Sequence, residues 1–525
     1  MYKYLTRFLL ALALLAPVLV CCSEKPVIND PLKNRSTTVC GTVSYDDGKA
    51  AAGITVSDGR KCVTTDSKGH YSFERSKGAR YVYYTIPNDA EVVTGGKYGL
   101  PVFYKLLRSG VNEYNFELKR QAVEKEFRLL TIGDPQVANT AQIKRFINET
   151  VADIRTYVES KKGDMPTYAV TMGDIVSNKW ELYPDMLPTM GRNNTGIPVF
   201  QCMGNHDHEF PKDGDEAAVQ TWESYVGPSN YAFDRSDVHI VVMDNIRHTG
   251  TASAAYDGGF WDWQYEWLKA ELSNVSRDKY IVLVVHCPFR EKFNNSNFGG
   301  DGHYQDMINL LGEFREARIC SGHTHYIRNT VTFEVNGHKI YDNNLGAACG
   351  GWWHSTLCTD ASPNGYGVFE FSGNRVKNHL YKSTNYDEGF QMRIYKGSEF
   401  KDFTTSFGQT YSWGYATVAG RAFVNVFNAN SSWEFEVYEN GVKTGTLSQG
   451  SKTYLDMFGP YSLYKMQSVA KDYTSKTWHL YYYNIKDEAN LKEIKVVARD
   501  GFGNVFTQTG FTAPDDYSGV SYPAR

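Results

Sequence analysis

The chain has 525 residues, of which 42% are hydrophobic and 22% are charged, and its formal net charge is -4. This hydrophobic content excludes wholesale disorder, and the length predicts about three domains because one hydrophobic core does not extend over so long a chain. The charge provides no basic surface for nucleic acid or for an anionic membrane, so no nucleic-acid partner is expected.

The N-terminal segment is typical of an export signal. Lys3 and Arg7 precede an uncharged apolar stretch over residues 8–20, which is shorter than the roughly 20 residues that cross a bilayer. Leu19-Val20-Cys21-Cys22 resembles a bacterial lipobox with Cys22 as the lipidated residue, although Cys21 replaces the usual Gly or Ala. An ordinary secretory peptide is the alternative. We predict a signal peptide over residues 1–22, a tether over 23–36, and an exported bacterial cell-envelope lipoprotein held at the periplasmic or cell-surface side by its lipid anchor.

Nine cysteines are present, but their spacing after the lipobox is too sparse to indicate a disulfide framework. Cys40 and Cys62 fall in one predicted domain and could pair. The chain has no CxxC pair, which argues against a structural zinc module.

Residues 37–120 are predicted to form a small antiparallel β-sandwich. Apolar residues alternate in short runs over residues 39–43, 54–56, 63–65 and 71–73, and turn signals such as Asp58-Gly59 separate the runs. The stretch over residues 53–73 resembles the transthyretin-like domains that are appended to secreted enzymes.

Residues 126–386 alternate apolar strands with amphipathic helices. Strands are expected over residues 127–132, 168–172, 198–203, 238–243, 280–285 and 317–321, and helices over about 143–158, 262–272 and 304–313. Fully apolar strands between amphipathic helices predict an α/β domain with a sheet covered on both faces. Its chemistry is expected at the carboxyl ends of the strands.

Residues 387–525 return to a β pattern. Strands are expected over residues 423–427, 433–438 and 494–498. Apolar and charged residues alternate before Asn440-Gly441, which predicts a hairpin with one solvated face. A third, sandwich-like domain follows from this pattern.

Five polar clusters occur in fixed order along the α/β domain, each after an apolar strand. They supply two carboxylates, one amide oxygen and three imidazoles, which is the inventory of a two-metal hydrolytic site. The clusters are Asp134-Pro135-Gln136, Gly173-Asp174, Gly204-Asn205-His206-Asp207, His286 and Gly322-His323-Thr324-His325.

Two neighbouring cations repel each other unless an anion lies between them, so Asp174 is predicted to bridge them. Asp134 and His325 would then bind the first cation, and Asn205, His286 and His323 the second. Nitrogen and oxygen ligands without thiolates suit Zn²⁺, Mn²⁺ or Fe, so two divalent metal ions of one of these kinds are the predicted cofactors.

The ordered motifs resemble the calcineurin-like metallophosphoesterase superfamily, whose pattern is D-x-H, G-D, G-N-H-D/E, H and G-H-x-H. The resemblance covers about residues 127–381, and the layout resembles an exported bacterial branch of that superfamily. It implies a four-layer αββα core, classed as α/β or α+β, between two all-β sandwich-like domains. Gln136 stands where the family has His, so the first metal would be bound through an amide oxygen, through water, or less tightly.

The resemblance also implies in-line attack on phosphorus by a metal-bound hydroxide. His206 would be the leaving-group acid or a stabiliser of the transition state, and Asp207 its orienting partner. A small-molecule or macromolecular phosphomonoester or phosphodiester is the implied substrate.

Other residues are weaker candidates for the substrate pocket. Trp352 and Trp353 could wall the pocket, or pack in the core. Arg290 could meet phosphate, or be a solvated surface charge. The loop over residues 294–302 could contact substrate, or only connect two elements.

A different class of function is also open. The chain could be an exported glycan- or partner-binding lipoprotein whose hydrolase core is degenerate, although only Gln136 departs from the family's ligand pattern. Other hydrolase classes are disfavoured because the sequence has no G-x-S-x-G, P-loop or H-E-x-x-H motif.

Overall fold

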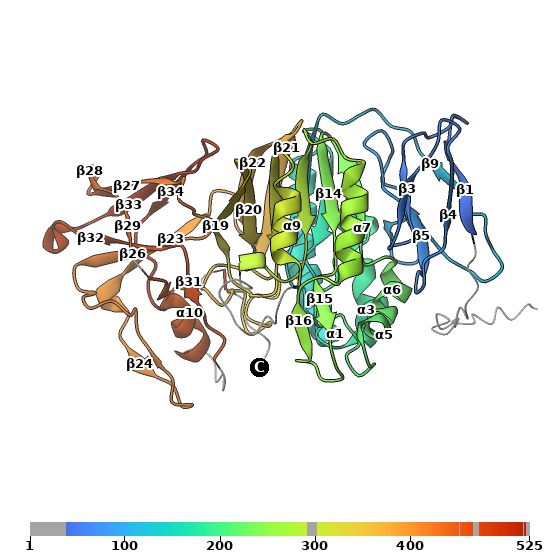
Figure 1. Ribbon diagram of the computed structural model, residues 1–525. Coiled ribbons are helices and arrows are strands. Elements are labelled where there is room, and N and C mark those ends of the chain that lie inside the picture. The colour runs from blue at the N-terminus through green and yellow to red at the C-terminus, as the bar shows by residue number, and fades with distance from the viewer. Residues whose placement is uncertain (1–37, 291–301, 451, 466–471, 518, 521–525) are drawn as a thin grey trace, which may run out of the picture.

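The computed structural model describes residues 38–290, 302–450, 452–465, 472–517 and 519–520. The predicted signal peptide with Cys22, the tether, and residues 294–301 lie outside the described residues. Figure 1 shows three parts in a row: an N-terminal β domain, a central domain with helices, and a C-terminal β domain. Within the described ranges, none of the helices combines the length and the apolar content needed to cross a membrane.

The N-terminal domain is β-rich, as predicted, and has two main sheets with the strand orders β4-β1-β9 and β3-β2-β5-β8. The pairing of β1 with β9 is parallel, whereas the alternating pattern predicted only antiparallel pairs. Cys40 and Cys62 are both free thiols, so the pairing considered for them is not formed. The strands are β1 (Thr38–Tyr45), β2 (Thr55–Ser57), β3 (Cys62–Thr64), β4 (His70–Glu74), β5 (Tyr81–Tyr84), β6 (Thr94–Gly95), β7 (Leu100–Pro101), β8 (Tyr104–Leu106) and β9 (Phe116–Leu118).

The central domain contains two sheets, not one. The first has the order β12-β11-β10-β21-β22 and the second the order β13-β14-β17-β18-β20-β19. The strands of the first are β10 (Glu126–Ile132), β11 (Thr167–Thr171), β12 (Val199–Phe200), β21 (Gly365–Ser372) and β22 (Arg375–Ser383). Those of the second are β13 (Tyr231–Arg235), β14 (Val238–Val242), β17 (Tyr280–Val284), β18 (Glu316–Ser321), β19 (Arg328–Val335) and β20 (His338–Asn344).

Side-chain alternation divides these strands between three cores. In β17, Val282 and Val284 join the core between the sheets, whereas Leu283 packs in the outer core with helices α7 (Asp262–Ser273) and α9 (Tyr304–Leu311). In β10, Leu129 faces the other sheet and Leu130 faces helices α1 (Thr140–Phe146) and α2 (Ala152–Ser160). Figure 1 shows α7 and α9 side by side on one outer face. The layers are helix, sheet, sheet and helix, which confirms the predicted αββα core.

The predicted helix over residues 143–158 is interrupted. A π-helical turn, Ile147–Val151, separates α1 from α2. This wider turn shifts the buried face, so Ile147 is 39% exposed while Ile143, Phe146 and Ile154 are buried.

Parallel pairing brings the polar clusters to one rim. Strands β10, β11 and β12 run parallel in one sheet, and β14, β17, β18 and β20 run parallel in the other. Asp134, Asp174 and Asn205 follow the strands of the first sheet, and His286 and His323 follow β17 and β18. Because carboxyl ends of parallel strands meet at one edge, the layers place these residues at a shared rim.

The C-terminal domain again has two sheets, ordered β23-β26-β32-β29 and β28-β27-β33-β34. The predicted hairpin is confirmed, because β27 and β28 pair across Asn440 and Gly441, whose φ angles of 50° and 82° suit a turn with two left-handed residues. The strands are β23 (Met392–Lys396), β26 (Arg421–Val426), β27 (Glu434–Glu439), β28 (Val442–Gly445), β29 (Ser448–Gln449), β32 (Leu480–Asn484), β33 (Ile494–Arg499) and β34 (Val505–Thr509).

Trp267 on α7 links the first two domains. Its side chain is fully buried, and its Nε1 donates to Oγ of Ser57 in β2 at 3.0 Å. We expect Trp267→Ala to lower the free energy of unfolding by about 3–5 kcal/mol, because it leaves a cavity in a packed core. Lys269→Ala on the exposed side of the same helix is the control, with a change within about 0.5 kcal/mol. Urea unfolding followed by circular dichroism measures both, and equal midpoints would contradict the prediction.

Candidate metal centre

Donor atoms from several strand ends meet around one ring nitrogen of the central domain. Nε2 of His286 lies 2.9 Å from Oδ1 of Asn205 and 3.3 Å from Oδ2 of Asp174. Nδ1 of His323 lies 3.1 Å from that same Nε2 and 3.1 Å from Oδ1 of Asn205. Asp174, His286 and His323 thus place donor atoms within 4.8 Å of one another, close enough for the three to bind one metal ion.

Asp134 and His325 lie beside this group. Nε2 of His325 is 3.7 Å from Oδ1 of Asp134, and that oxygen is 4.0 Å from Nδ1 of His286. Nε2 of Gln136 lies 3.3 Å from Oδ2 of Asp174. The structure therefore brings together all six side chains predicted to bind metal, and Gln136 lies beside them.

The outer contacts of the histidines orient their rings. Nδ1 of His286 is 2.8 Å from the carbonyl oxygen of Met172, and Nδ1 of His325 is 3.0 Å from that of Gly350. A carbonyl oxygen only accepts, so each Nδ1 carries a proton and each Nε2 faces the centre. Burial lowers the pKa of His323 to about 3 and that of His325 to about 4, so both rings are neutral at pH 7 and able to bind a cation.

The carboxylates add negative charge where water is excluded. Burial raises the pKa of Asp134 to about 8. Burial alone would lower the pKa of His286, but Asp174 and Asp134 raise it to about 9. A proton and a cation would satisfy the same oxygens beside Nε2 of His286, so metal binding would release that proton. Neutral imidazoles, carboxylates and an amide oxygen fit Zn²⁺, Mn²⁺ or Fe.

The backbone of the site is strained. Eight of the fourteen described non-glycine residues with positive φ belong to it or adjoin it, and each such residue costs about 1–3 kcal/mol. Strain of this kind gathers at functional sites, where the surrounding structure holds it in place. The eight are Asp134, Gln136, Asp174, Asn178, His323, His325, Trp352 and Trp353.

Three glycines let the ligand-bearing turns approach one another. A Cβ on Gly173 would lie 2.5 Å from Nδ1 of His286, and a Cβ on Gly204 would lie 2.3 Å from Oδ1 of Asp174. A Cβ on Gly322 would lie 2.4 Å from Oδ2 of Asp134. The glycines that precede Asp174, Asn205 and His323 are therefore packing requirements of the centre.

His206 lies next to the predicted metal ligands, but the partner of its ring differs from the prediction. Its backbone N–H donates to Oδ1 of Asp174 at 2.9 Å, and its Nδ1 is 2.9 Å from Oδ1 of Asn178. Asn178, and not Asp207, is the partner of that ring nitrogen. An amide oxygen accepts, so Asn178 places the proton on Nδ1 and leaves Nε2 for another contact.

Asp207 instead supports the turns that carry the ligands. Its buried carboxylate accepts from the backbone N–H of Gly204 at 2.9 Å and of Ile175 at 3.0 Å. The hydroxyl of Tyr183 donates to it at 3.0 Å. Because these partners occupy its oxygens, Asp207 fixes the Asp174 and Asn205 turns to each other.

The three weaker candidates have different surroundings. Trp352 is 37% exposed and stacks on His325, with ring centroids 4.3 Å apart. Trp353 is buried and its Nε1 donates to the carbonyl oxygen of Pro135 at 3.0 Å, so it packs in the core. The described contact of Arg290 is from its backbone N–H to Asp342 at 2.8 Å.

Sequence reasoning missed Asn178, Tyr256 and Tyr473. Asn178 follows Asp174 by four residues, which is a signal that could have pointed to it. Tyr256 meets His323 edge-on at 6.3 Å, and Tyr473 meets Trp352 at 5.3 Å. Both tyrosines come from segments with no local motif, so only the folded chain brings them to the site.

Three family models match the chain. They are described as N terminal of Calcineurin-like phosphoesterase over residues 37–121, Calcineurin-like phosphoesterase over 127–326, and C terminal of Calcineurin-like phosphoesterase over 342–506. All six predicted metal ligands fall within the second range. The third range includes β21 and β22, which complete the first sheet of the central domain.

Curated plant proteins are also similar. Purple acid phosphatase 18 of Arabidopsis thaliana is 24% identical over 278 residues, covering 50% of this chain and 59% of that protein. Purple acid phosphatase 21 of the same plant is 23% identical over 196 residues, covering 34% and 42%. The chain spans about half the length of these relatives. Among solved structures, a purple acid phosphatase, PPD1, from yellow lupin (Lupinus luteus) seeds matches with a TM-score of 0.36 at 12% identity, covering 62% of this chain and 56% of that one.

Gly204 offers a test of the metal centre. We expect Gly204→Ala to lower the bound metal per chain at least severalfold, because its methyl group would displace the carboxylate of Asp174. Gly389→Ala is the matched control, since its Cβ would meet nothing within 4 Å and its φ is not positive. Elemental analysis after equal metal loading measures both, and equal metal content in the two variants would contradict the predicted geometry.

Proposed function

The chain belongs to the calcineurin-like phosphoesterases, and from this premise we propose that it uses two divalent cations to hydrolyse a phosphomonoester or a phosphodiester. The observation that carries the proposal is the convergence of Asp174, Asn205, His286 and His323 on one point, with Asp134 and His325 beside it. A divalent cation would satisfy these donor atoms together in one buried volume.

The donor set supports Mn²⁺, Fe or Zn²⁺ as the ions. Sγ of Cys349 lies 3.6 Å from Nδ1 of His325, and burial raises the pKa of this thiol well above its ordinary value. Gln136 donates from its amide to Asp174, so in this orientation it supports the proposed bridging carboxylate. Its oxygen lies toward Cys349 at 3.8 Å.

When bound, the cations would activate water and neutralise charge on the phosphoryl oxygens. In hydrolysis, the water oxygen forms a bond to phosphorus, the ester P–O bond breaks, and the leaving oxygen takes a proton. We assign delivery of that proton to His206, whose Nδ1 is held by Asn178. Asp207 acts through the backbone, since it fixes the two turns that bear Asp174 and Asn205.

We further propose that the protein works outside the cytoplasm, anchored in the bacterial cell envelope through Cys22. The charged and apolar pattern of residues 3–22 supports this placement. Its substrates would then be small-molecule or macromolecular phosphoesters that reach the envelope.

The catalytic proposal is tested on purified protein with 4-nitrophenyl phosphate and bis(4-nitrophenyl) phosphate. We expect about two metal ions per chain, loss of hydrolysis with a chelator, and recovery on adding Mn²⁺ or Zn²⁺. His206→Ala should keep its metal and lower kcat by about 10²–10⁴-fold, the range for loss of a general acid. His338→Ala is the control, because His338 is the first residue of β20, at the strand end opposite the rim. Full turnover by His206→Ala would remove it from the proton transfer, and a chain that takes up no metal would defeat the proposal.

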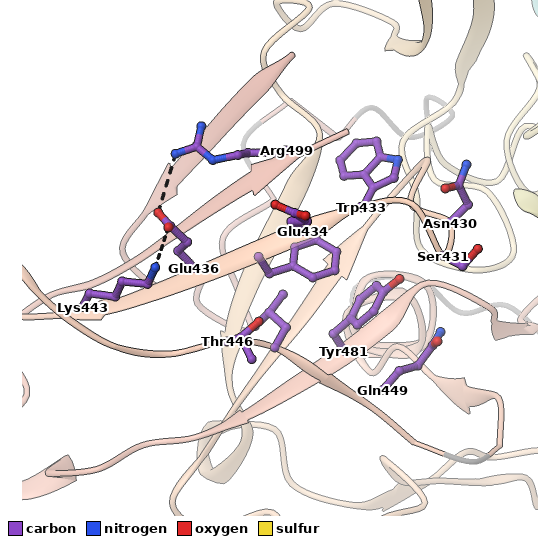
Figure 2. A pocket seen from close by; sticks show the side chains of 12 residues that line it. Asn430, Ser431, Trp433, Glu434, Glu436, Lys443, Thr446, Gln449, Tyr481 and Arg499 are labelled. Carbon is purple, nitrogen blue, oxygen red and sulfur yellow. Dashed lines mark hydrogen bonds and ion pairs between the residues drawn. The ribbon is translucent and has the colours of Figure 1, made fainter. Parts of the chain in front are cut away.

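A second function is favoured by a pocket of about 530 Å³ in the C-terminal domain (Figure 2). Trp433, Phe435 and Tyr481 form its aromatic part. The ring of Trp433 stacks on Phe506 with centroids 5.6 Å apart, and Phe435 meets Tyr481 at 4.7 Å, so these rings support one another.

The charges of this pocket balance. Glu436 pairs with Lys443 at 2.6 Å and with Arg499 at 3.7 Å, as Figure 2 shows. Aromatic faces beside amide and carboxylate groups, with two acidic and two basic side chains in the lining, suit a neutral polyhydroxylated ligand. Glycan binding was the alternative to hydrolysis in a chain with a degenerate core. The pocket supports glycan binding by the C-terminal domain in addition to hydrolysis in the central domain.

Affinity electrophoresis in native gels that contain dextran, xylan or mannan tests this second function. We expect at least one polysaccharide to retard the protein and Trp433→Ala to abolish the retardation, because stacking on the indole would be lost. Phe502→Ala is the control, since Phe502 is 40% exposed and does not line the pocket. Equal mobility of wild type and Trp433→Ala in every gel would reject the pocket as a saccharide site.

A further inference from the structure

Trp352 occupies an unusual position beside the metal centre. Its ring stacks on that of His325 at 4.3 Å with an interplanar angle of 25°, yet 37% of the residue is exposed. Its φ of 49° is left-handed, and bulky residues rarely adopt this conformation. Core packing does not explain this strain, because the side chain is not buried.

The neighbouring residues hold Trp352 in place. Trp353, with φ of 64°, is buried, and its Nε1 donates to the carbonyl oxygen of Pro135. Its own carbonyl accepts from Nη1 of Arg145 at 2.7 Å. The N–H of Gly351 donates to the carbonyl oxygen of Leu357 at 2.6 Å. The segment is therefore clamped to the Asp134 turn, and the clamp presents Trp352 over a predicted metal ligand.

The row of rings continues into the C-terminal domain. The ring of Tyr473 lies 5.3 Å from that of Trp352 and 4.3 Å from that of His354. Tyr473 is held by its backbone N–H, which donates to the hydroxyl of Tyr464 at 2.7 Å. Two residues later the N–H of Ser475 donates to the carbonyl oxygen of Thr359 in the central domain, also at 2.7 Å. The C-terminal domain thus contributes an aromatic side chain next to the centre.

The residues of this aromatic row, Trp352, Tyr473 and His354, carry no fixed charge. Burial lowers the pKa of His354, so its ring is neutral at pH 7. An uncharged aromatic surface offers no positive charge to phosphoryl oxygens, whereas a flat, apolar group would stack on it. Trp352, the first ring of the row, stacks on His325. A flat substrate group that stacks on the row would therefore lie next to a phosphoryl group bound at the cations.

We propose that the aromatic row recognises the leaving group of the substrate and selects phosphoesters whose leaving alcohol carries a flat ring, such as an aryl group or a nucleobase. This inference rests on the proposed phosphoesterase function. Trp352 and Tyr473 are its specificity-determining residues, and Tyr473 gives the C-terminal domain a part in substrate choice.

The test uses pairs of substrates. Both members of a pair are phosphates of a primary alcohol, and only one of the two alcohols carries an aromatic ring. Adenosine 5′-monophosphate is compared with ribose 5-phosphate, and 2-phenylethyl phosphate with butyl phosphate, each also as its methyl diester. We expect the wild type to prefer the ring-bearing member. Trp352→Ala and Tyr473→Ala should lower kcat/KM for that member by about 5- to 150-fold, the range for loss of one stacking contact, and so reduce the preference.

Further variants separate recognition from a structural role. Trp352→Tyr, which keeps a flat ring, should restore much of the preference, and Phe502→Ala should leave it unchanged. Metal content is measured for every variant. Equal losses on both members of each pair, or no change, would overturn the aromatic row as a selector while leaving the hydrolase proposal in place. A metal-loaded wild type that cleaves none of the substrates would instead count against the hydrolase itself.

Discussion

Everything at the active rim depends on one electrostatic conflict: lone pairs and negative charge are packed together where water cannot separate them. Nε2 of His286 has an amide oxygen, a carboxylate oxygen and another ring nitrogen within 3.3 Å. Such crowding costs free energy unless a positive charge occupies the centre. The family to which this chain belongs implies that divalent metal ions supply this charge. The donor atoms are already close together without a cation, which limits the reorganisation that metal binding requires.

Two devices let the chain hold this arrangement. The first is the pairing of two sheets whose parallel strands deliver ligands to one rim from both sides. The second is the backbone just after those strands, where glycines remove side chains that would clash and residues such as Asp134 and His323 accept left-handed conformations. Hydrogen bonds from Asp207 and from the carbonyl of Met172 keep the turns in register.

The sequence predicted those features of the fold and the site that depend on short stretches of neighbouring residues. Apolar runs such as residues 280–285 marked the strands, and the polar residues that follow them marked the rim. Contacts set by packing were beyond it. The π-helical turn at Ile147–Val151 contains no glycine or proline that would indicate a break in the helix. The partner of His206 was predicted wrongly, because Asp207 is its neighbour in sequence while Asn178 is its neighbour in space. Tyr473 is supplied by another domain, and no short-range pattern connects it with His325.

The antiparallel pairing of β10 with β21 has a consequence for dividing the chain. Asp134 follows β10 by two residues, and the register of β10 with β21 runs from Glu126↔Ser372 to Thr131↔Gly367. A fragment that stops at residue 326 would contain all six predicted metal ligands and still lack β21, the strand that pairs with one edge of β10. An unpaired strand edge of this kind favours self-association. A fragment meant to fold as a monomer would therefore have to extend through β22.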